Sequence, residues 1–358
     1  MKLVTIIGAR PQFIKAAVVS RAFQKSNQVE EVIVHTGQHF DTNMSDVFFE
    51  EMSIPKPKYN LNINGLGHGA MTGQMLEKIE EVLLEEKPDW VLVYGDTNST
   101  LAGAIAATKL HIKVAHVEAG LRSFNMKMPE EVNRILTDRV SNVLFCPTDQ
   151  AVDNLLKEGY ANIDAYIVNI GDVMQDAAMF YSSKAKIGNL EIPSDYILCT
   201  IHRAENTDDP QRLKSIIDAL NKISQNTDIV LPLHPRTRLK LDAIGFSFET
   251  SKIKFIEPVG YLEMVHLLKN CSLVMTDSGG LQKEAYFFSK YCITLRDETE
   301  WVELVNNGYN SLVGSDYNKI INEVESQLKY GDLEKSDYLY GRGDAGEKIL
   351  EKLLEFNS

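Results

Sequence analysis

The sequence predicts an α/β protein built of two doubly wound halves that face a cleft. Short apolar runs alternate with amphipathic stretches from end to end, and this alternation is typical of parallel sheets covered by helices. Most of the runs are apolar nearly throughout rather than at every second residue, as strands buried on both faces require. A chain of 358 residues is also too long for one compact core.

The strand and helix patterns divide into two series. The first series has strand candidates at residues 3–7, 31–35, 90–94, 113–117, 143–146 and 166–170, with helical patterns at 13–24, 71–86 and 99–110 among those between them. The second series has strand candidates at residues 196–200, 229–233, 253–256, 273–275 and 291–295. We therefore expect one domain at residues 1–180 and a second at 181–340.

Two segments lie outside these series. The stretch 182–194, which contains Gly188 and Pro193, is the best candidate for an interdomain connection. The last segment, 341–358, holds a helical pattern at 347–356 that could pack back on the first domain. The sequence alone does not decide which half receives this helix.

Composition restricts the partners and the compartment. A net charge of −13 argues against nucleic acid or an acidic membrane as the main partner. No signal segment precedes the first strand pattern, and no apolar run approaches the length of a membrane span. The four cysteines lie far apart in or beside apolar runs, so we expect buried thiols, no disulfides, no metal site and a cytoplasmic location.

The most informative motif is the segment 278–284, which follows the apolar run ending at Asp277. Ser278, Gly279 and Gly280 place several unpaired backbone N–H groups at a helix start, and this arrangement suits a phosphate or diphosphate. Glu284, one turn later, could accept hydrogen bonds from ribose hydroxyls. A Gly-Gly turn that merely caps a helix is the alternative from this stretch alone.

A cationic pair follows the first strand. Arg10 lies in the turn, Pro11 suits the first position of a helix, and Lys15 comes one turn later. This segment lacks the glycine pattern of a dinucleotide-binding turn. The pair suits a phosphate group, although an isolated pair of this kind is more often solvated surface.

Three acidic residues lie at or after strand ends of the first half. Asp96 follows the run 90–94, where Asp96 or Thr97 could instead cap the next helix. His116 and Glu118 point to the same face if their strand continues. Glu130 opens an acidic helix start, where it could simply complement the helix dipole. If Asp96, Glu118 and Glu130 converge, they suit proton abstraction and return.

The second half carries histidine–arginine pairs after two strands. His202 and Arg203 follow the strand at 196–200, and His234 and Arg236 follow the next strand. Placed beside the 278–280 turn, these residues favour binding of a nucleotide diphosphate as an anionic leaving group. No metal-ligand spacing, P-loop or order of residues typical of a Ser–His–Asp triad appears.

Together these motifs resemble the non-hydrolysing UDP-N-acetylglucosamine 2-epimerases. The match extends over nearly the whole chain and includes residues 8–15, 38–39, 95–97, 116–122, 129–131, 202–203, 278–284 and 296–297. The resemblance implies a B-type glycosyltransferase fold of two Rossmann-like domains, a UDP-sugar substrate, a homodimer and no cofactor. It also implies a role in making surface polysaccharide precursors.

In this family UDP is eliminated to leave a 2-acetamidoglucal and then adds back with C2 inverted. The resemblance implies that Asp96, Glu118 and Glu130 supply the acid and base chemistry, without fixing their individual roles. His202, with Arg10, Lys15 and Arg203, would stabilise the departing diphosphate. Ser278, Gly279 and Gly280 would hold phosphate, and Glu284 would bind ribose.

Several positions depart from the commonest members of the family. This chain has Gln12 in place of Glu and Trp301 in place of Arg, which resembles the UDP-2,3-diacetamido-2,3-dideoxyglucuronate 2-epimerase branch. A C6 carboxylate would need a cation or amide donor, for which Gln12, Arg122 and Arg134 are the candidates. Only Gln38 and His39 remain of the segment that binds a second, allosteric substrate in some members, which argues against allosteric control.

Two other functions stay open. A B-type glycosyltransferase would share the fold and the UDP-sugar donor but would release UDP only when an acceptor is present. A non-catalytic nucleotide-sugar sensor would need no acid or base groups, so three converging carboxylates argue against it.

Overall fold

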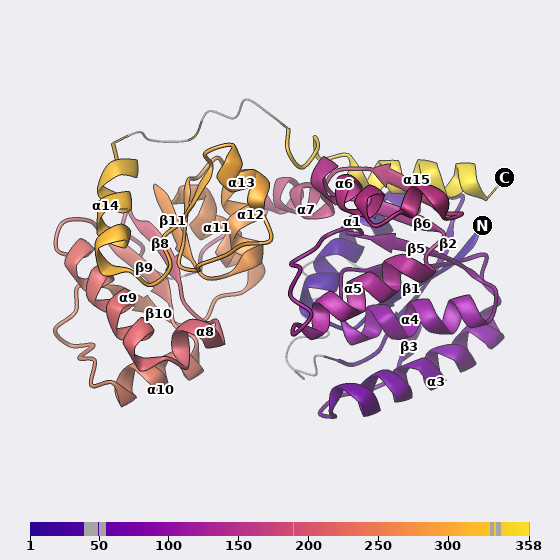
Figure 1. The fold of residues 1–358 in the computed structure, drawn as a ribbon, viewed down its shortest axis with the longest axis horizontal. Helices are drawn as coiled ribbons and strands as arrows, with labels where there is room; N and C mark the ends of the chain where they lie inside the picture. The colour runs from indigo at the N-terminus through magenta and orange to yellow at the C-terminus, as the bar shows by residue number, and fades with distance from the viewer. Residues whose placement is uncertain (39–48, 50–54, 189, 330–332, 334–337, 358) are drawn as a thin grey trace. The chain divides into compact units, whose positions relative to one another are not determined.

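The chain forms two compact units, each built around one sheet. A computed structural model describes all residues except 39–48, 50–54, 189, 330–332, 334–337 and 358. Unit 1 comprises residues 1–177 and 338–358, and unit 2 comprises residues 178–337 (Figure 1). Both sheets are parallel and flanked by helices. This confirms the predicted α/β class with two doubly wound sheets.

The sheet of unit 1 has the order β3-β2-β1-β4-β5-β6-β7. Its central strands are apolar throughout because helices cover both of their faces. The short edge strand β3 lacks such a run, and sequence analysis did not find it. The strands are β1 (Lys2–Ile7), β2 (Glu30–His35), β3 (Tyr59–Asn60), β4 (Trp90–Tyr94), β5 (Lys113–Val117), β6 (Val143–Cys146) and β7 (Tyr166–Asn169).

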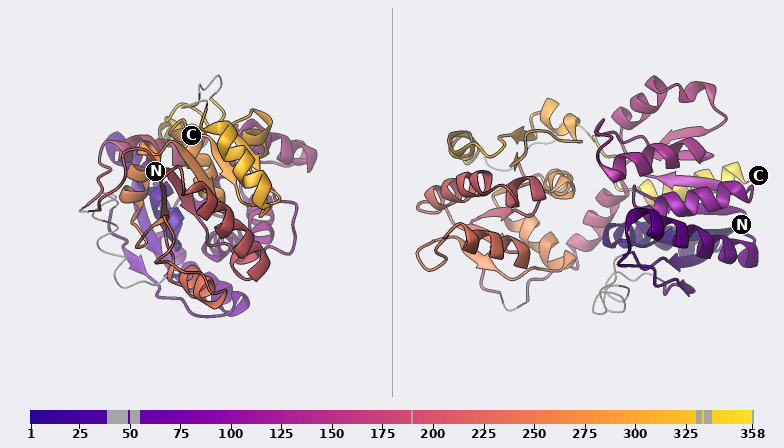
Figure 2. Two further views of the ribbon diagram at one scale, coloured as in Figure 1. Left: turned by 90° about the vertical axis from the view of Figure 1, so that its left-hand side faces the viewer. Right: turned by 60° about the horizontal axis from the view of Figure 1, so that its bottom comes forward.

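Helices α3 and α4 cover one face of this sheet, where their apolar stripes meet Val4, Val32 and Val91. Helix α1 lies on the strands β1, β2 and β4 and also packs against the C-terminal helix α15. Both chain ends therefore belong to unit 1 (Figure 2). The helices are α1 (Arg10–Ser26), α3 (His68–Glu86), α4 (Asn98–Lys109), α5 (Pro129–Val140), α6 (Asp149–Lys157), the 3-10 turn η1 (Tyr160–Asn162) and α15 (Ala345–Phe356).

The sheet of unit 2 has the order β10-β9-β8-β11-β12-β13. Helices α9 and α14 contribute to the core on one face, and α11 and α12 to the core on the other. The strands are β8 (Ile197–Thr200), β9 (Ile229–Pro232), β10 (Lys254–Ile256), β11 (Leu273–Thr276), β12 (Cys292–Thr294) and β13 (Asn310–Leu312). The helices are α8 (Ala204–Thr207), α9 (Pro210–Ile223), α10 (Pro235–Ala243), α11 (Tyr261–Asn270), α12 (Gly279–Phe287), α13 (Val302–Asn306) and α14 (Tyr317–Gln327).

The chain passes from unit 1 to unit 2 inside helix α7 (Val173–Ser182), at Ala177 and Ala178. The prediction of a connection at 182–194 was therefore wrong, because this stretch belongs to unit 2. Its Ile187 and Ile192 pack on the core that contains Leu198. The pattern of small and polar residues reflects an irregular segment anchored by two apolar side chains.

The strand order brings specific turns together within each unit. In unit 1, β1 pairs with both β2 and β4, so the turns after β1 and β4 are neighbours. In unit 2, β8 likewise pairs with β9 and β11. Doubly wound sheets bind ligands at such a reversal of strand order, beyond the carboxyl ends of the strands. All eleven candidate site residues lie in turns after strands or in the first two turns of the helices that follow.

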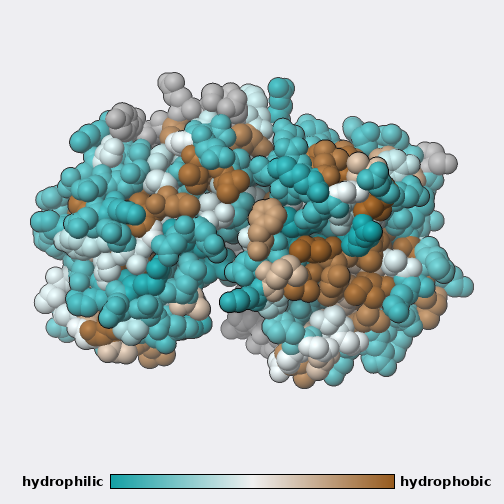
Figure 3. All heavy atoms as spheres, in the orientation of Figure 1, coloured by the Kyte–Doolittle hydropathy of each residue, from teal (hydrophilic) through white to brown (hydrophobic). Residues whose placement is uncertain are grey.

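The two units differ in the hydropathy of the surface that Figure 3 shows. Brown side chains gather over α4 and α5 of unit 1, whereas the visible face of unit 2 is mainly teal (Figure 3). Exposed Leu136 on α5 belongs to unit 1, as do exposed Phe124 and Met126 in the loop before α5. Among the described residues, no helix combines the length and apolarity that crossing a membrane requires.

A buried carboxyl group lies beneath α1. Glu31 on β2 accepts a hydrogen bond of 2.6 Å from the Thr5 hydroxyl on β1. Its second oxygen, Oε2, is buried beside the Ser20 side chain of α1. Burial raises the pKa of Glu31 from its ordinary value of 4.5 to about 7, because desolvation disfavours the charged form.

Glu31 should make folding stability depend on pH. Between pH 4.5 and about 7 the folded chain keeps a proton that the unfolded chain has lost, so stability falls as pH rises. We expect Glu31→Gln to remove this slope and to raise the unfolding free energy at pH 8 by about 1–3 kcal/mol. Urea titrations at several pH values measure this. Glu30→Gln, whose side chain is 70% exposed, is the matched control, and parallel profiles for both variants would contradict the account.

Candidate functional site

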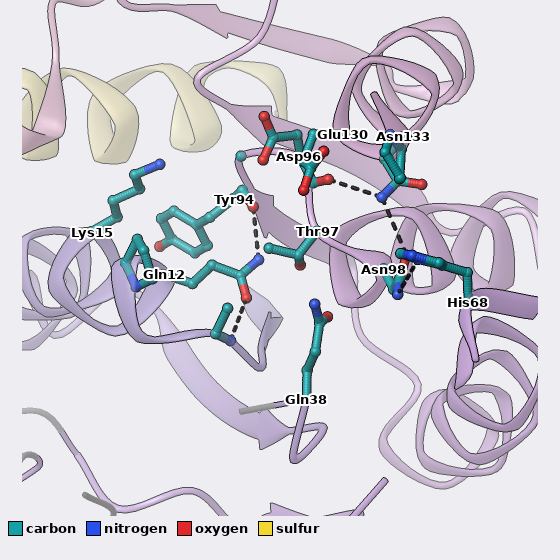
Figure 4. A pocket seen from close by; sticks show the side chains of 14 residues that line it. Gln12, Lys15, Gln38, His68, Tyr94, Asp96, Thr97, Asn98, Glu130 and Asn133 are labelled. Atoms are coloured by element: carbon teal, nitrogen blue, oxygen red, sulfur yellow. Dashed lines mark hydrogen bonds between the residues drawn. The ribbon is translucent and has the colours of Figure 1, made fainter. Parts of the chain in front are cut away.

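Unit 1 contains a cavity of about 210 Å³ at the reversal of its strand order. Lys15 of α1, Asp96 after β4, and Glu130 at the start of α5 all line this cavity. Figure 4 shows Lys15 and Gln12 on one side and Asn133 on the other, with Asp96 and Glu130 between them. The fold of this unit thus brings two of the three predicted carboxylates to one space.

Close packing of the turns shapes the floor of this cavity. A Cβ atom on Gly8 would lie 2.0 Å from the Thr36 hydroxyl and 2.2 Å from the Ser99 hydroxyl, so only glycine fits there. Gln12 then closes the turn, because its Oε1 accepts from the backbone N–H groups of Gly8 and Ala9. Its Nε2 donates to the carbonyl of Tyr94 and to Thr100.

Gln12 therefore uses both hydrogen-bonding ends of its amide within the fold. The prediction that Gln12 could bind a substrate carboxylate does not agree with this arrangement. Its replacement of the usual Glu instead provides two donors that tie the start of α1 to the end of β4. Arg10, the first residue of α1, is partly exposed.

Asp96 and Thr97 have separate functions in the turn after β4. Thr97 is the N-cap of α4, and its hydroxyl accepts a hydrogen bond from the backbone N–H of Thr100. The cap alternative therefore applies to Thr97 and not to Asp96. Asp96 lines the cavity, and its side chain is 31% exposed. Its Oδ2 atom contacts Nη2 of Arg134.

Lys15 and Glu118 form an ion pair in which each side chain is about one-tenth exposed. Gly95 provides the space for this pair, because a Cβ atom there would lie 3.3 Å from Lys15 Nζ and 3.4 Å from Glu118 Oε2. Glu118 is the first residue after β5, and its φ of 74° places it in the left-handed region. The Lys15 ammonium, which was predicted to bind phosphate, is therefore paired with the Glu118 carboxylate.

His116 and Glu118 were expected to share a face only if their strand continued through Glu118. This condition is not met, because strand β5 ends at Val117 and the left-handed backbone of Glu118 breaks the alternation. His116 is fully buried, with Nδ1 2.7 Å from Asp138 and Nε2 2.6 Å from the carbonyl of Gly95. His116 thus contacts Gly95, which lines the cavity, and is not itself one of the lining residues.

Arg122 is also part of this supporting network. Its Nη1 donates to Asp138 at 2.7 Å, while Nε and Nη2 contact the carboxylate of Glu158. The two acidic partners outweigh burial and raise the pKa of Arg122 above its ordinary value. Arg122 is therefore not a candidate for binding a substrate carboxylate.

Helix α5 begins with two acidic residues that have different surroundings. Glu130 is exposed and lines the cavity. Glu131 is 1% exposed and accepts hydrogen bonds from the backbone N–H groups of Ser123 and Phe124. Both lie in the first helical turn, where the dipole favours negative charge. Gln38 contacts Ser99, whereas His39 lies outside the described residues.

In unit 2, a buried aspartate organises the turn that carries the histidine–arginine pair. Asp277 follows β11, is fully buried, and accepts hydrogen bonds from the backbone N–H groups of His202 and Arg203. Asn206 donates to the same carboxylate at 3.3 Å. The His202 ring lies 3.5 Å from Asp277 and keeps 45% of its side chain exposed.

The surroundings of His202 shift the pKa of its ring. Partial burial, with Arg203 and His234 nearby, lowers the pKa of His202 below its ordinary value, against the opposing effect of Asp277. The second predicted pair has a more local function. His234 is the N-cap of α10, where its Nδ1 accepts from the backbone N–H of Arg236, and Arg236 pairs with Asp208.

The glycine turn lies at the start of α12, beside β8 and the His202 turn. Ser278 occupies the N-cap position, but its side chain makes no capping hydrogen bond. Gly279 is tightly approached, because a Cβ atom there would lie 2.1 Å from Glu300 and 3.7 Å from Arg203. Gly280 is open on its side-chain face, and Glu284 lies one turn further along α12.

Trp301 does not project into open space. It is 4% exposed, and the Lys283 ammonium lies 4.1 Å from the centre of its ring. The nearby Arg296 pairs with Glu300 at 3.0 Å and with Glu205 at 3.3 Å. This segment therefore shapes the side of the glycine turn through charged pairs and aromatic packing.

A family model described as UDP-N-acetylglucosamine 2-epimerase matches residues 21–354. The chain belongs to this family. It is 58% identical to the UDP-2,3-diacetamido-2,3-dideoxy-D-glucuronate 2-epimerase of Pseudomonas aeruginosa, across 99% of this chain and 100% of the relative. Both the predicted family and the predicted branch are confirmed.

Two solved epimerase structures share the fold over nearly their whole length. The UDP-GlcNAc 2-epimerase of Methanocaldococcus jannaschii, in complex with UDP-GlcNAc and UDP, is 46% identical with a TM-score of 0.86, covering 99% of this chain and 100% of that chain. The enzyme of Neisseria meningitidis bound to UDP-GlcNAc is 34% identical with a TM-score of 0.88 at the same coverage. These likenesses confirm the fold predicted from the resemblance.

Sequence analysis missed two residues that organise this epimerase, Asp277 and Asp138, which accept backbone hydrogen bonds in the fold. It named Arg134, but only as a partner for a substrate carboxylate and not as the partner of Asp96. Asp277 could have been found from its place between an apolar strand and the glycine turn. No sequence signal distinguishes Asp138 from an ordinary acidic residue of a helix.

Asp277 should be essential for the structure of its turn. Asp277→Asn would place an amide N–H group where Oδ1 now accepts from the backbone N–H of His202, and a neutral oxygen would replace the carboxylate for the other donors, His202, Arg203 and Asn206. We expect a loss of about 2–4 kcal/mol of unfolding free energy in urea titrations. Asp297→Asn is the matched control, since its 71% exposed side chain pairs with Arg212 at the surface. Equal effects of both substitutions would contradict this account.

Proposed function

We propose that this isomerase inverts C2 of a UDP-linked 2-acetamido sugar without a cofactor. In the first step the C1–O bond to UDP breaks and the C2 proton leaves, which forms a glycal. In the second step UDP adds back at C1 and a proton returns to the opposite face of C2. The observation that carries the proposal is the cavity of unit 1, with Asp96 and Glu130 on its wall and Glu118 bound to Lys15.

Inversion at C2 needs acid and base groups on both faces of the sugar ring. The proton leaves from one face and returns to the other, so one carboxylate cannot perform both steps. Asp96, Glu118 and Glu130 come from three different segments of unit 1 that adjoin the same cavity or its Lys15. We assign the acid and base chemistry to these three groups.

The departing diphosphate must be well stabilised because the C2 proton is not next to a carbonyl. We assign this work to His202 and Arg203, to Arg10 and Lys15, and to the backbone donors of the 278–280 turn. One well-placed donor to developing negative charge is worth about 2.7–4 kcal/mol. The ring of His202 is 45% exposed and lies in the turn after β8, so its N–H could donate to the departing diphosphate. Glu284 would bind the ribose hydroxyls.

For the substrate we propose a UDP-2,3-diacetamido-2,3-dideoxyglucuronate. Its support is the Pseudomonas aeruginosa relative, which carries this name and is 58% identical, against 46% for the Methanocaldococcus jannaschii UDP-N-acetylglucosamine 2-epimerase. UDP-N-acetylglucosamine is the second candidate.

A cytoplasmic location and a homodimer remain proposals. All four cysteines are free and buried, as suits a reducing compartment. The homodimer is proposed from the resemblance to the family alone.

The reaction can be tested by NMR in deuterated water. Each of the two candidate UDP-sugars is incubated with the protein and the C2 position is followed. We expect deuterium at C2 in both epimers while the sugar stays linked to UDP, with faster exchange in the 2,3-diacetamido uronate. Asp96→Asn should lose this exchange because it removes an acid/base group.

The other functions predict different products. A glycosyltransferase would release UDP only with an acceptor and would leave C2 unlabelled. A sensor would bind the nucleotide sugar without any exchange. Free sugar and UDP as the sole products would contradict a non-hydrolysing epimerase.

A further inference from the structure

Arg134 joins two carboxylates beside the cavity of unit 1. It lies on the second turn of α5, and its side chain is 10% exposed. Nη2 contacts Oδ2 of Asp96, and Nη1 lies 2.8 Å from Oε2 of Glu131. The planar guanidinium can contact two carboxylates at once, which a lysine ammonium on a flexible stem does less well.

The partner on the far side of Arg134 is itself firmly held. Glu131 accepts hydrogen bonds from the backbone N–H of Ser123 at 3.0 Å and from that of Phe124 at 2.9 Å. The Ser123 hydroxyl donates to Oε2 of Glu131 at 3.0 Å. Because Glu131 is almost fully buried, it anchors Arg134 to the backbone of the loop before α5.

Asp96, in contrast, has little else to orient it. Asn133 donates to the backbone carbonyl of Asp96 at 2.9 Å, which fixes the turn but not the side chain. Within the described part of the chain, Arg134 is the hydrogen-bonding partner of the Asp96 carboxylate. Asp96 and Glu130 are thus linked through one helix, since α5 carries both Glu130 and Arg134.

We propose that Arg134 is a positioning residue that directs the Asp96 carboxylate into the cavity and fixes it relative to Glu130. This inference rests on the proposed function, in which both carboxylates act on one sugar ring. A misplacement of about 1 Å in such a group can reduce the rate about 100-fold. Arginine suits position 134 because its guanidinium can donate to Asp96 through Nη2 and to Glu131 through Nη1 at the same time.

The test compares variants on the same helix. Arg134→Gln removes the charge and Arg134→Lys keeps it but breaks the bridge. Arg139→Gln is the matched control, because Arg139 is exposed on α5 and lies 5.9 Å from the ring of Tyr160. Each variant is assayed for C2 deuterium exchange, with kcat, KM and the thermal midpoint measured separately.

We expect both Arg134 variants to lower kcat about 100-fold while KM changes little, and Arg139→Gln to behave as the unaltered protein. If Arg134→Lys has the kcat of the unaltered protein, a positive charge at this position is sufficient, and the proposed role of the bridge between Asp96 and Glu131 is wrong. If activity falls only as the folded fraction falls, Arg134 is structural and the inference fails.

A second variant keeps the test decisive if Arg134 is needed for folding. Glu131→Gln leaves Arg134 in place but weakens its anchor, so kcat should fall about 10-fold at unchanged KM; full kcat in this variant would overturn the inference. The two levels of the account fail separately. Exchange by the unaltered protein together with active Arg134 variants refutes only the positioning role, whereas no exchange on either substrate refutes the proposed function and this inference with it.

Discussion

The order in which parallel strands pair decides which turns of this chain become neighbours. In unit 1 the reversal of strand order beside β1 puts the turn that begins α1 next to the turn that carries Asp96. In unit 2 the same reversal beside β8 puts the His202 turn next to the glycine turn at α12. Apolar side chains of the strands and of the helices that cover them pack into the core of each unit and hold the strands in register. The positions of the polar turns at the ends of the strands therefore follow from this core packing.

Buried polar residues then give each turn its shape. Gln12 and His116 contact the carbonyls of Tyr94 and Gly95 from two directions, and Asp277 gathers the backbone N–H groups after β8. A buried acceptor that satisfies several donors at once is costly to replace, because each donor would otherwise remain unpaired. The proposed acid, base and phosphate-binding groups therefore depend on a second set of residues whose polar atoms are used in hydrogen bonds within the fold.

Much of the fold could be predicted from the sequence, because apolar runs mark strands and polar residues follow them. The positions of Asp96, His202 and the 278–280 turn directly after strands were predicted in this way. Backbone geometry could not be predicted: the left-handed φ of Glu118 separates it from His116. Long-range pairing was equally hidden, since Arg134 and Asp96 lie 38 residues apart and meet only when α5 packs beside α4.

The central claim is that UDP leaves C1 and returns to it within one catalytic cycle. Positional isotope exchange tests this most directly, using a UDP-sugar labelled with ¹⁸O in the oxygen that bridges C1 and the β-phosphorus. Cleavage and return would make the β-phosphate oxygens equivalent, so the account predicts label in the non-bridging positions of recovered substrate and product. Label that stays in the bridge while C2 exchanges its proton over many turnovers would contradict it.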